Sequence, residues 1–254
     1  MTDSSAPDPV RATAAPPAGI RTLVFDVLGT VVDEAGSIAA ETAAALSAAG
    51  SDPGRGPQLA ADWMRRLDAM ISLISTGDAA WRSNDALRRA ALLDALRTAG
   101  LDGLPPGVIG ELALAGHRLR PWPDSARALQ SLAGGFSVVA LSNADLAQLA
   151  TFSAAGGLAW HCVLSAELVK AYKPDPAVYR LALDLLSLNP QQTMMVAAHP
   201  WDLRSAAAHG MRSAYVSRPG EGIPAADDNF DVSAASLADL ANLLVPGAGG
   251  GTTQ

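Results

Sequence analysis

From about residue 119 onward the sequence alternates between short apolar runs and helical segments, and this alternation constrains the fold more than any other feature. Helices separate four apolar runs, at residues 136–142, 161–165, 193–198 and 213–217. Strands that alternate with helices form a parallel sheet, because the helix of each right-handed crossover packs back onto the sheet. Helices then cover both faces of the sheet, so its strands are apolar on both sides. The pattern therefore predicts an α/β protein with a Rossmann-like parallel sheet core.

A helical block separates this region from one earlier strand. Residues 21–27 form a short apolar run bounded by glycines, which is typical of a buried strand. Residues 35–118 have helical spacing without a strand signal, and Asn84 is the expected N-cap of their last long helix. We predict a core of residues 20–34 and 119–245, with residues 35–118 inserted as a helical cap domain.

The two ends of the chain differ from this core in composition. Residues 1–19 are rich in Pro, Ser, Thr and Ala, without the basic and apolar regions of a secretory signal. Residues 246–254 are rich in glycine. We expect a disordered N-terminal arm and a flexible C-terminal tail.

Composition excludes several classes of partner. The net charge is −7, without a clustered basic patch, so we expect no nucleic-acid partner. The sequence contains no run of 18 apolar residues, so we expect no membrane span. Cys162 is the single cysteine, which rules out a disulfide within one chain and fits a reducing, cytoplasmic location.

Polar side chains follow the first four of the five predicted strands. In open α/β sheets, ligands bind outside the carboxyl ends of the strands. The residues at these ends therefore converge on one rim of the sheet: Asp26 and Thr30, then Ser142 and Asn143, then Lys173, and finally His199 and Asp202.

Asp26 is the central residue of this predicted site. A carboxylate buried at a strand end protonates unless a cation or hydrogen-bond donors stabilise its charge. Lys173 is the natural counter-charge, and the hydroxyls of Thr30 and Ser142 are the natural donors. A carboxylate held ionised in this way is a competent nucleophile for covalent catalysis.

These residues resemble the four motifs of the haloacid dehalogenase superfamily, and within it the type II (L-2-haloacid) dehalogenases. The motifs are FDVLGTVVD, LSNAD, ELVKAYKPDPAVY and VAAHPWDL, and the likeness covers roughly residues 20 to 240. The resemblance implies that Asp26 attacks the substrate carbon and forms an ester, and that Asp202 orients Lys173 and assists ester hydrolysis. It also assigns Ser142, Asn143 and Tyr179 to the site, although a tyrosine on an amphipathic helix packs as often as it binds.

Leu28 decides between the two main reactions of this superfamily. Its phosphatases carry a second aspartate at that position, which protonates the leaving alkoxide and helps to hold magnesium. General acid catalysis of this kind contributes about 10² to 10⁴ in rate, whereas a halide ion leaves without a proton. The fourth motif also offers only Asp202 where phosphatases usually have two or three acidic residues, and magnesium needs several oxygen ligands. We therefore expect carbon–halogen cleavage without a metal or other cofactor.

The sequence departs from the type II dehalogenase pattern at three places. Leu28 replaces a tyrosine, and Ala197-Ala198-His199 replaces serine-x-asparagine. The substrate-binding arginine that usually follows a tryptophan is absent after Trp63, so we expect Arg65 to serve, with Arg66 as the alternative. His199 acts either as a base that positions water or as a neutral hydrogen-bond donor.

The predicted function is therefore hydrolytic dehalogenation of a small anionic 2-haloalkanoic acid to a 2-hydroxy acid. Trp63, Trp81 and Trp201 either line an apolar pocket for the substrate or pack in the fold. Three alternatives remain: a magnesium-dependent phosphatase, a hydrolase of another electrophile, and a non-catalytic binding module. The resemblance also suggests a homodimer.

Overall fold

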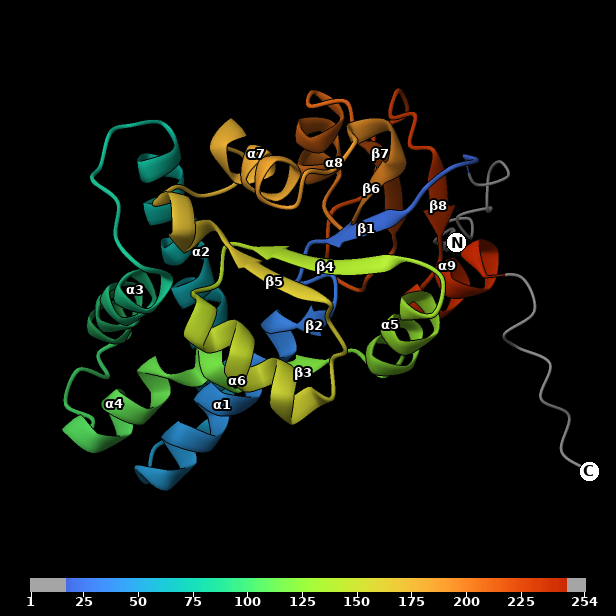
Figure 1. The fold of residues 1–254 in the computed structure, drawn as a ribbon. Helices are drawn as coiled ribbons and strands as arrows, with labels where there is room; N and C mark the ends of the chain where they lie inside the picture. The colour runs from blue at the N-terminus through green and yellow to red at the C-terminus, as the bar shows by residue number, and fades with distance from the viewer. Residues whose placement is uncertain (1–16, 246–254) are drawn as a thin grey trace, which may run out of the picture.

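The computed structural model describes residues 17–245, and its centre is a six-stranded parallel sheet in the order β5-β4-β1-β6-β7-β8 (Figure 1). The predicted α/β class and parallel sheet are confirmed. The strands are β1 (Thr22–Phe25), β4 (Ser137–Ser142), β5 (Cys162–Ser165), β6 (Thr193–Ala197), β7 (Arg212–Val216) and β8 (Val232–Ala234). The three-residue edge strand β8 was not predicted, because it is too short to show a sequence pattern.

Strand β1 lies between β4 and β6, and its register places the start of the site. Phe25 is level with Ala140 on β4 and Val196 on β6, so the carboxyl ends of the three strands meet at one rim. The next residue, Asp26, still donates its backbone N–H to Val196 O, at 2.9 Å. This hydrogen bond fixes the backbone position of Asp26.

Alternate side chains of each strand point to opposite faces of the sheet, and a different group of helices covers each face. Leu23 and Phe25 pack in a cluster with α5 (Ser125–Ala133), α6 (Leu146–Gly156) and α9 (Leu237–Leu244), whereas Val24 packs with α7 (Pro176–Leu185) and α8 (Pro200–Ala207). Figure 1 shows α7 and α8 on one side of the sheet and α5 and α6 on the other. Both faces are buried, which explains the continuous apolar strands.

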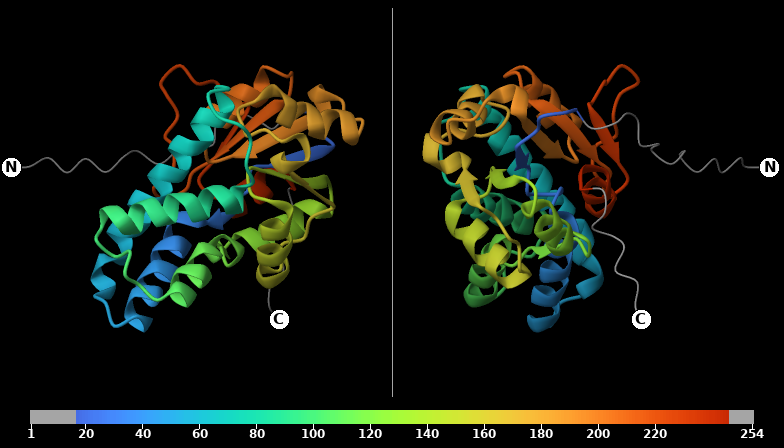
Figure 2. Two further views of the ribbon diagram at one scale, coloured as in Figure 1. Left: turned by 90° about the vertical axis from the view of Figure 1, so that its left-hand side faces the viewer. Right: turned by 45° about the vertical axis from the view of Figure 1, so that its right-hand side comes forward.

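The helical segment after β1 lies beside the carboxyl ends of the strands (Figure 2). It leaves and rejoins the core through a short antiparallel pair, β2 (Val32–Asp33) and β3 (Arg120–Pro121), which was too short to predict. Its helices are α1 (Glu34–Ala48), α2 (Gly56–Ser75), α3 (Asn84–Thr98) and α4 (Pro106–Ala113). Four 3-10 helices complete the elements: η1 (Pro53–Arg55), η2 (Ala115–His117), η3 (Ala166–Val169) and η4 (Pro190–Gln192).

Details of the helical segment correct the sequence analysis. The N-cap of α3 is Ser83, whose side chain accepts from Ala86 N, and the predicted N-cap Asn84 is instead buried inside the first turn. Trp63 is fully buried and donates its indole N–H to Arg88 O, so it packs in the fold.

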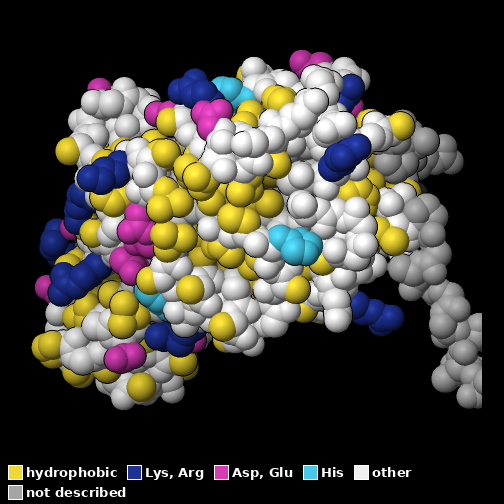
Figure 3. Space-filling model, viewed as in Figure 1, with side chains coloured by type: hydrophobic (Ala, Val, Ile, Leu, Met, Phe, Trp, Pro, Cys, Tyr) yellow, Lys and Arg dark blue, Asp and Glu magenta, His cyan; other side chains and the backbone are white. Residues whose placement is uncertain are grey.

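The surface of the described residues carries charges of both signs. On the face in Figure 3, Lys and Arg side chains lie scattered, many of them beside acidic ones. Within residues 17–245, no helix is both long and apolar enough to cross a bilayer. Residues 1–16 of the predicted arm and the predicted tail, 246–254, lie outside the described residues.

Candidate active site

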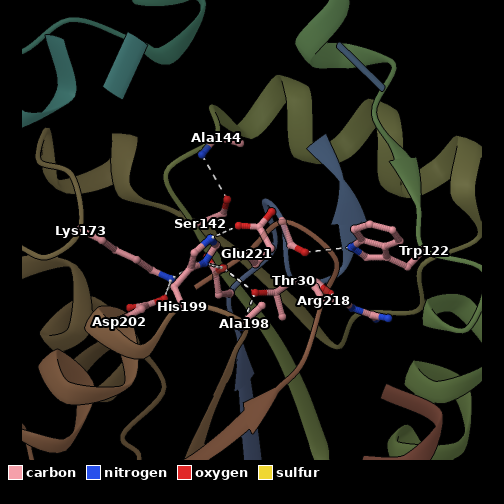
Figure 4. A network of polar contacts seen from close by, with 12 residues as sticks. Thr30, Trp122, Ser142, Ala144, Lys173, Ala198, His199, Asp202, Arg218 and Glu221 are labelled. Atoms are coloured by element: carbon pink, nitrogen blue, oxygen red, sulfur yellow. Dashed lines mark hydrogen bonds and ion pairs between the residues drawn. The ribbon is translucent and has the colours of Figure 1, made fainter. Parts of the chain in front are cut away.

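Side chains from three of the four predicted chain segments meet in one network at the carboxyl ends of the central strands (Figure 4). Asp26 follows β1, and Lys173 lies in the loop before α7. His199 is the N-cap of α8, and Asp202 lies in the first turn of that helix. The structure brings these four residues into one hydrogen-bonded network with Thr30.

The two carboxylate oxygens of Asp26 have different partners. Oδ1 accepts from Lys173 Nζ at 3.1 Å. Oδ2 accepts from Thr30 Oγ1 at 2.7 Å and lies 2.9 Å from His199 Nδ1. The Thr30 hydroxyl itself accepts from Ala198 N at 2.9 Å, so its own proton is directed at Asp26.

Asp26 is ionised in this environment. Burial alone would raise its pKa, but the charge of Lys173 and the hydrogen bonds from His199 and Thr30 outweigh burial and hold the pKa well below its usual range. The carboxylate is therefore charged at neutral pH, as a nucleophile must be.

Lys173 lies between two carboxylates, as its predicted role requires. Its Nζ donates to Asp26 Oδ1 and, at 2.7 Å, to Asp202 Oδ2, and the side chain is buried. Burial alone would lower the pKa of Lys173, but the two carboxylates outweigh burial and raise it. Burial raises the pKa of Asp202, and the nearby charge of Asp26 adds to that effect. The charge of Lys173 opposes this rise.

Three residues that the sequence predicts at the site make hydrogen bonds to protein groups other than the Asp26 carboxylate. Tyr179 is fully buried and donates its phenol to Asp202 Oδ1 at 2.6 Å, so it orients Asp202 and does not line the cavity, contrary to the predicted substrate contact. Asn143 Oδ1 accepts from Lys173 N at 2.8 Å. Ser142 Oγ accepts from Ala144 N at 3.2 Å, and it is Thr30 that donates to Asp26.

His199 has a second carboxylate partner that the sequence analysis missed. Its Nε2 lies 2.9 Å from Oε2 of Glu221, a residue in the loop after β7. Burial alone would lower the pKa of His199, but the hydrogen bonds to Asp26 and Glu221 raise it to about 10. The imidazole is therefore charged at neutral pH, and its two ring nitrogens face the carboxylates of Asp26 and Glu221.

The turn after Asp26 lies next to the side chain of Glu221. Gly29 has φ +75°, and a Cβ built there would lie 2.5 Å from Glu221 Oε1. Trp122 Nε1 donates to Gly29 O at 2.8 Å, and Arg218 Nε donates to Thr30 O at 2.9 Å (Figure 4). The positive φ favours glycine at this position, and the missing Cβ leaves room for the end of the flexible Glu221 side chain.

A cavity of about 120 Å³ opens beside Asp26, Lys173 and His199, between the core and the helical segment. Six residues of its wall also line an adjoining cleft of about 670 Å³: Asp68, Ile71, Asn143, Lys173, His199 and Trp201. Leu28 lines the cavity, and the ring of Trp201 lies tilted against His199, with centroids 5.7 Å apart. The rest of the cavity wall is Glu34, Met64, Leu67, Asn84 and Arg88.

The predicted cap arginine is wrong. Arg65 is exposed, pairs with Asp62 at 2.8 Å and lines a different surface hollow. Arg66 pairs with the same carboxylate and does not line the cavity either. The guanidinium that lines the cavity belongs to Arg88 on α3. Its sequence signal is a lone arginine on a helix face that is otherwise apolar.

Arg88 is held by groups that also line the cavity. Its Nε donates to Asn84 Oδ1 at 2.6 Å, and its Nη2 pairs with Glu34. Asp68 faces the same cavity, and burial together with the charge of Glu34 raises the pKa of Asp68. Among residues 17–245, no group of three His, Cys, Asp or Glu side chains is arranged to hold a metal ion.

The fold and this geometry define a class: a hydrolase with a parallel α/β core, an aspartate nucleophile at a strand end and a lysine beside it. Residues 20–210 match the model of the haloacid dehalogenase-like hydrolase family. This match covers most of the chain, so the protein belongs to that family.

Two curated relatives are similar over most of their length. The chain is 32% identical over 206 residues to (S)-2-haloacid dehalogenase 4A of Burkholderia cepacia, which covers 79% of this chain and 84% of the relative. It is 31% identical over 205 residues to (S)-2-haloacid dehalogenase 1 of Pseudomonas sp. (strain CBS-3), which covers 78% and 85%. The chain is thus an (S)-2-haloacid dehalogenase-like hydrolase.

Solved structures agree with this placement. The L-2-haloacid dehalogenase PA0810 superposes with a TM-score of 0.83 at 34% identity, covering 89% of this chain and 99% of that one. The defluorinating L-2-haloacid dehalogenase Rha0230 superposes with a TM-score of 0.84 at 31% identity, covering 91% and 98%.

The His199 site predicts a pH dependence of stability. The pKa of His199 is about 10 in the folded protein, against 6.5 for an unperturbed histidine. The stabilisation is therefore complete below pH 6.5 and is lost as the pH rises toward 10. In that window the folded state holds one extra proton, so the free energy of unfolding falls by up to about 1.4 kcal/mol per pH unit. Denaturant titrations at pH 7 and pH 9 should show a larger fall for the wild type than for His199→Gln, and equal falls would contradict the assignment.

Proposed function

We propose that this protein is a hydrolytic dehalogenase of small 2-haloalkanoic acids and that its products are 2-hydroxy acids. One observation carries the proposal: Asp26 is ionised, lies against Lys173, and opens onto a small cavity in which Leu28 stands where a phosphatase has its acid. The names of the similar dehalogenases support the same activity and the (S) enantiomer of the substrate.

In the first step, a lone pair on Asp26 Oδ1 attacks C2 of the substrate from the side opposite the halogen. The Oδ1–C2 bond forms and the carbon–halogen bond breaks, with its electron pair leaving on the halide ion. C2 is inverted, and the enzyme carries an aspartyl ester. A halide needs no proton to leave, so the apolar Leu28 beside the nucleophile is compatible with this reaction.

In the second step, water attacks Cγ of the aspartyl ester. Asp202, whose pKa is raised and which Tyr179 orients, accepts the proton of the attacking water. The Cγ–Oδ1 bond then breaks, and the 2-hydroxy acid leaves with Oδ1 and a proton from Lys173, which recovers one from Asp202. Asp26 is left as a carboxylic acid that carries the oxygen of water, and it loses its proton to solvent, which restores the charged nucleophile. The sum is haloalkanoate plus water giving hydroxyalkanoate, halide and one proton.

Arg88 takes the place of the predicted Arg65 in this proposal. The substrate is an anion, and a guanidinium binds a carboxylate through two parallel hydrogen bonds. Arg88 is buried in the cavity wall and held by Asn84, so its orientation is fixed before the substrate arrives. Glu34 competes for it, and substrate binding therefore includes displacement of part of that ion pair.

We also propose a domain division, a cellular location and an oligomeric state. We propose that residues 35–118 form a cap domain, because Met64, Leu67 and Arg88 from that segment enclose the cavity over the nucleophile. A cytoplasmic location fits the single cysteine. The resemblance to type II dehalogenases favours a homodimer.

The substrate class is tested by halide release. Purified protein should release chloride from L-2-chloropropionate, with no release from the D enantiomer, and Asp26→Asn should reduce the rate at least 10³-fold because an amide is a poor nucleophile. Release of fluoride from fluoroacetate tests whether the enzyme also cleaves the stronger carbon–fluorine bond. Magnesium-dependent release of phosphate from p-nitrophenyl phosphate, without any halide release, would contradict the proposal.

The role of Arg88 is tested against the arginine that the sequence favoured. Arg88→Lys keeps the charge but loses the paired hydrogen bonds, so kcat/KM for chloropropionate should fall by about 10- to 100-fold, mainly through KM. Arg65→Lys, on the exposed side of α2, is the matched control and should leave both constants unchanged. A larger effect at Arg65 than at Arg88 would contradict the assignment.

A further inference from the structure

We propose that His199, held by Glu221, is the electrophilic group for hydrolysis of the ester: it donates its Nδ1–H to Oδ2 of Asp26, the oxygen that carries the negative charge when water attacks. This inference rests on the proposed function, because it assigns a role within the second half of that reaction. His199 is then a charged hydrogen-bond donor of the oxyanion hole.

The hydrogen bonds of Asp26 determine which oxygen attacks. Oδ2 is held by two short bonds, 2.7 Å from Thr30 Oγ1 and 2.9 Å from His199 Nδ1. Oδ1 has one longer bond, 3.1 Å from Lys173 Nζ. The oxygen with fewer donors keeps a lone pair for the substrate, so Oδ1 forms the ester bond. Oδ2 then becomes the ester carbonyl and keeps both of its donors.

The same two donors are placed for the tetrahedral intermediate. When the oxygen of water bonds to Cγ, the π electrons of the ester carbonyl move onto Oδ2. Donors at 2.7 to 3.1 Å from that atom stabilise it without further reorganisation. Thr30 is fixed by Ala198 N, and His199 is fixed on its far side by Glu221, so both donors already point at Oδ2.

Glu221 keeps His199 charged when the charge on Asp26 disappears. In the free enzyme the imidazolium faces two carboxylates, but formation of the ester neutralises Asp26. Glu221 Oε2, 2.9 Å from His199 Nε2, is the anion that remains. Gly29, which has no Cβ, lies next to that carboxylate. Glu221 is therefore a positioning residue that acts through His199.

This arrangement has opposite consequences for the two half-reactions. A cation that donates to the Asp26 carboxylate withdraws electron density from the nucleophile and slows its attack on C2. The same cation stabilises the oxyanion and accelerates attack by water on Cγ. A merely structural role of His199 would slow both steps together, so the two rates distinguish the roles.

Rapid-quench kinetics with L-2-chloropropionate, combined with intact-protein mass measurement, separates the steps. In His199→Ala the first chloride per active site should be released at the wild-type rate or faster, whereas ester hydrolysis should slow by about 100- to 1,000-fold. The ester should then accumulate as a covalent adduct on Asp26. His199→Asn, which restores a neutral donor, should hydrolyse faster than the alanine variant, and it is the second variant if His199→Ala does not fold.

Glu221→Gln should slow hydrolysis in the same direction by a smaller factor, on the order of tenfold. Glu111→Gln, the same change on an exposed α4 side chain, is the matched control and should leave both rates unchanged. Slower chloride release in His199→Ala without accumulated ester would overturn the inference. A wild-type protein that releases no chloride would instead overturn the proposed function.

Discussion

The buried contact of Lys173 with Asp26 and Asp202 is the interaction on which the rest of this structure depends. The three charged residues are at most 6% exposed, and an unpaired charge there would be very costly. Each comes from a different part of the chain: the end of β1, the loop before α7 and the first turn of α8. Removing one partner would leave an uncompensated buried charge, which costs about 3–5 kcal/mol. The parallel sheet and the active site therefore stabilise each other.

The sequence predicted the parts of the site that follow directly from strand ends. Asp26, Lys173, His199 and Asp202 were found because parallel strands bring their carboxyl ends to one rim, whatever the details of the loops. Glu221 was missed because its contact with His199 depends on a long loop after β7, whose path has no sequence periodicity.

Helix geometry explains why the prediction of Arg65 as the cap arginine was wrong. We placed Arg65 by its nearness in sequence to Trp63, but successive residues of a helix point about 100° apart. Met64, Leu67, Asp68 and Ile71 have the spacing of one helix face, and this face of α2 lines the cavity. Arg65 lies off that face. Arg88 could have been found from its position on the apolar face of α3, but its direction toward Asp26 depends on how the helical segment docks on the core.

His199 shows how one substitution in a motif changes the electrostatics of a site. An asparagine there would offer a neutral amide, whereas the histidine, between two carboxylates, offers a charged donor to the nucleophile. That donor lies on Oδ2, so the account assigns attack to Oδ1 and the oxyanion to Oδ2. The two oxygens of one aspartate thus have separate tasks because their neighbours differ.

The central claim is that Asp26 itself supplies the oxygen of the product. A single turnover in H₂¹⁸O, with enzyme in excess over L-2-chloropropionate, tests it by mass spectrometry of the lactate and of the peptide that contains Asp26. The account predicts unlabelled oxygen in the product hydroxyl and one ¹⁸O in the Asp26 carboxylate. An ¹⁸O label in the lactate with an unlabelled Asp26 would show direct attack by water and would contradict it.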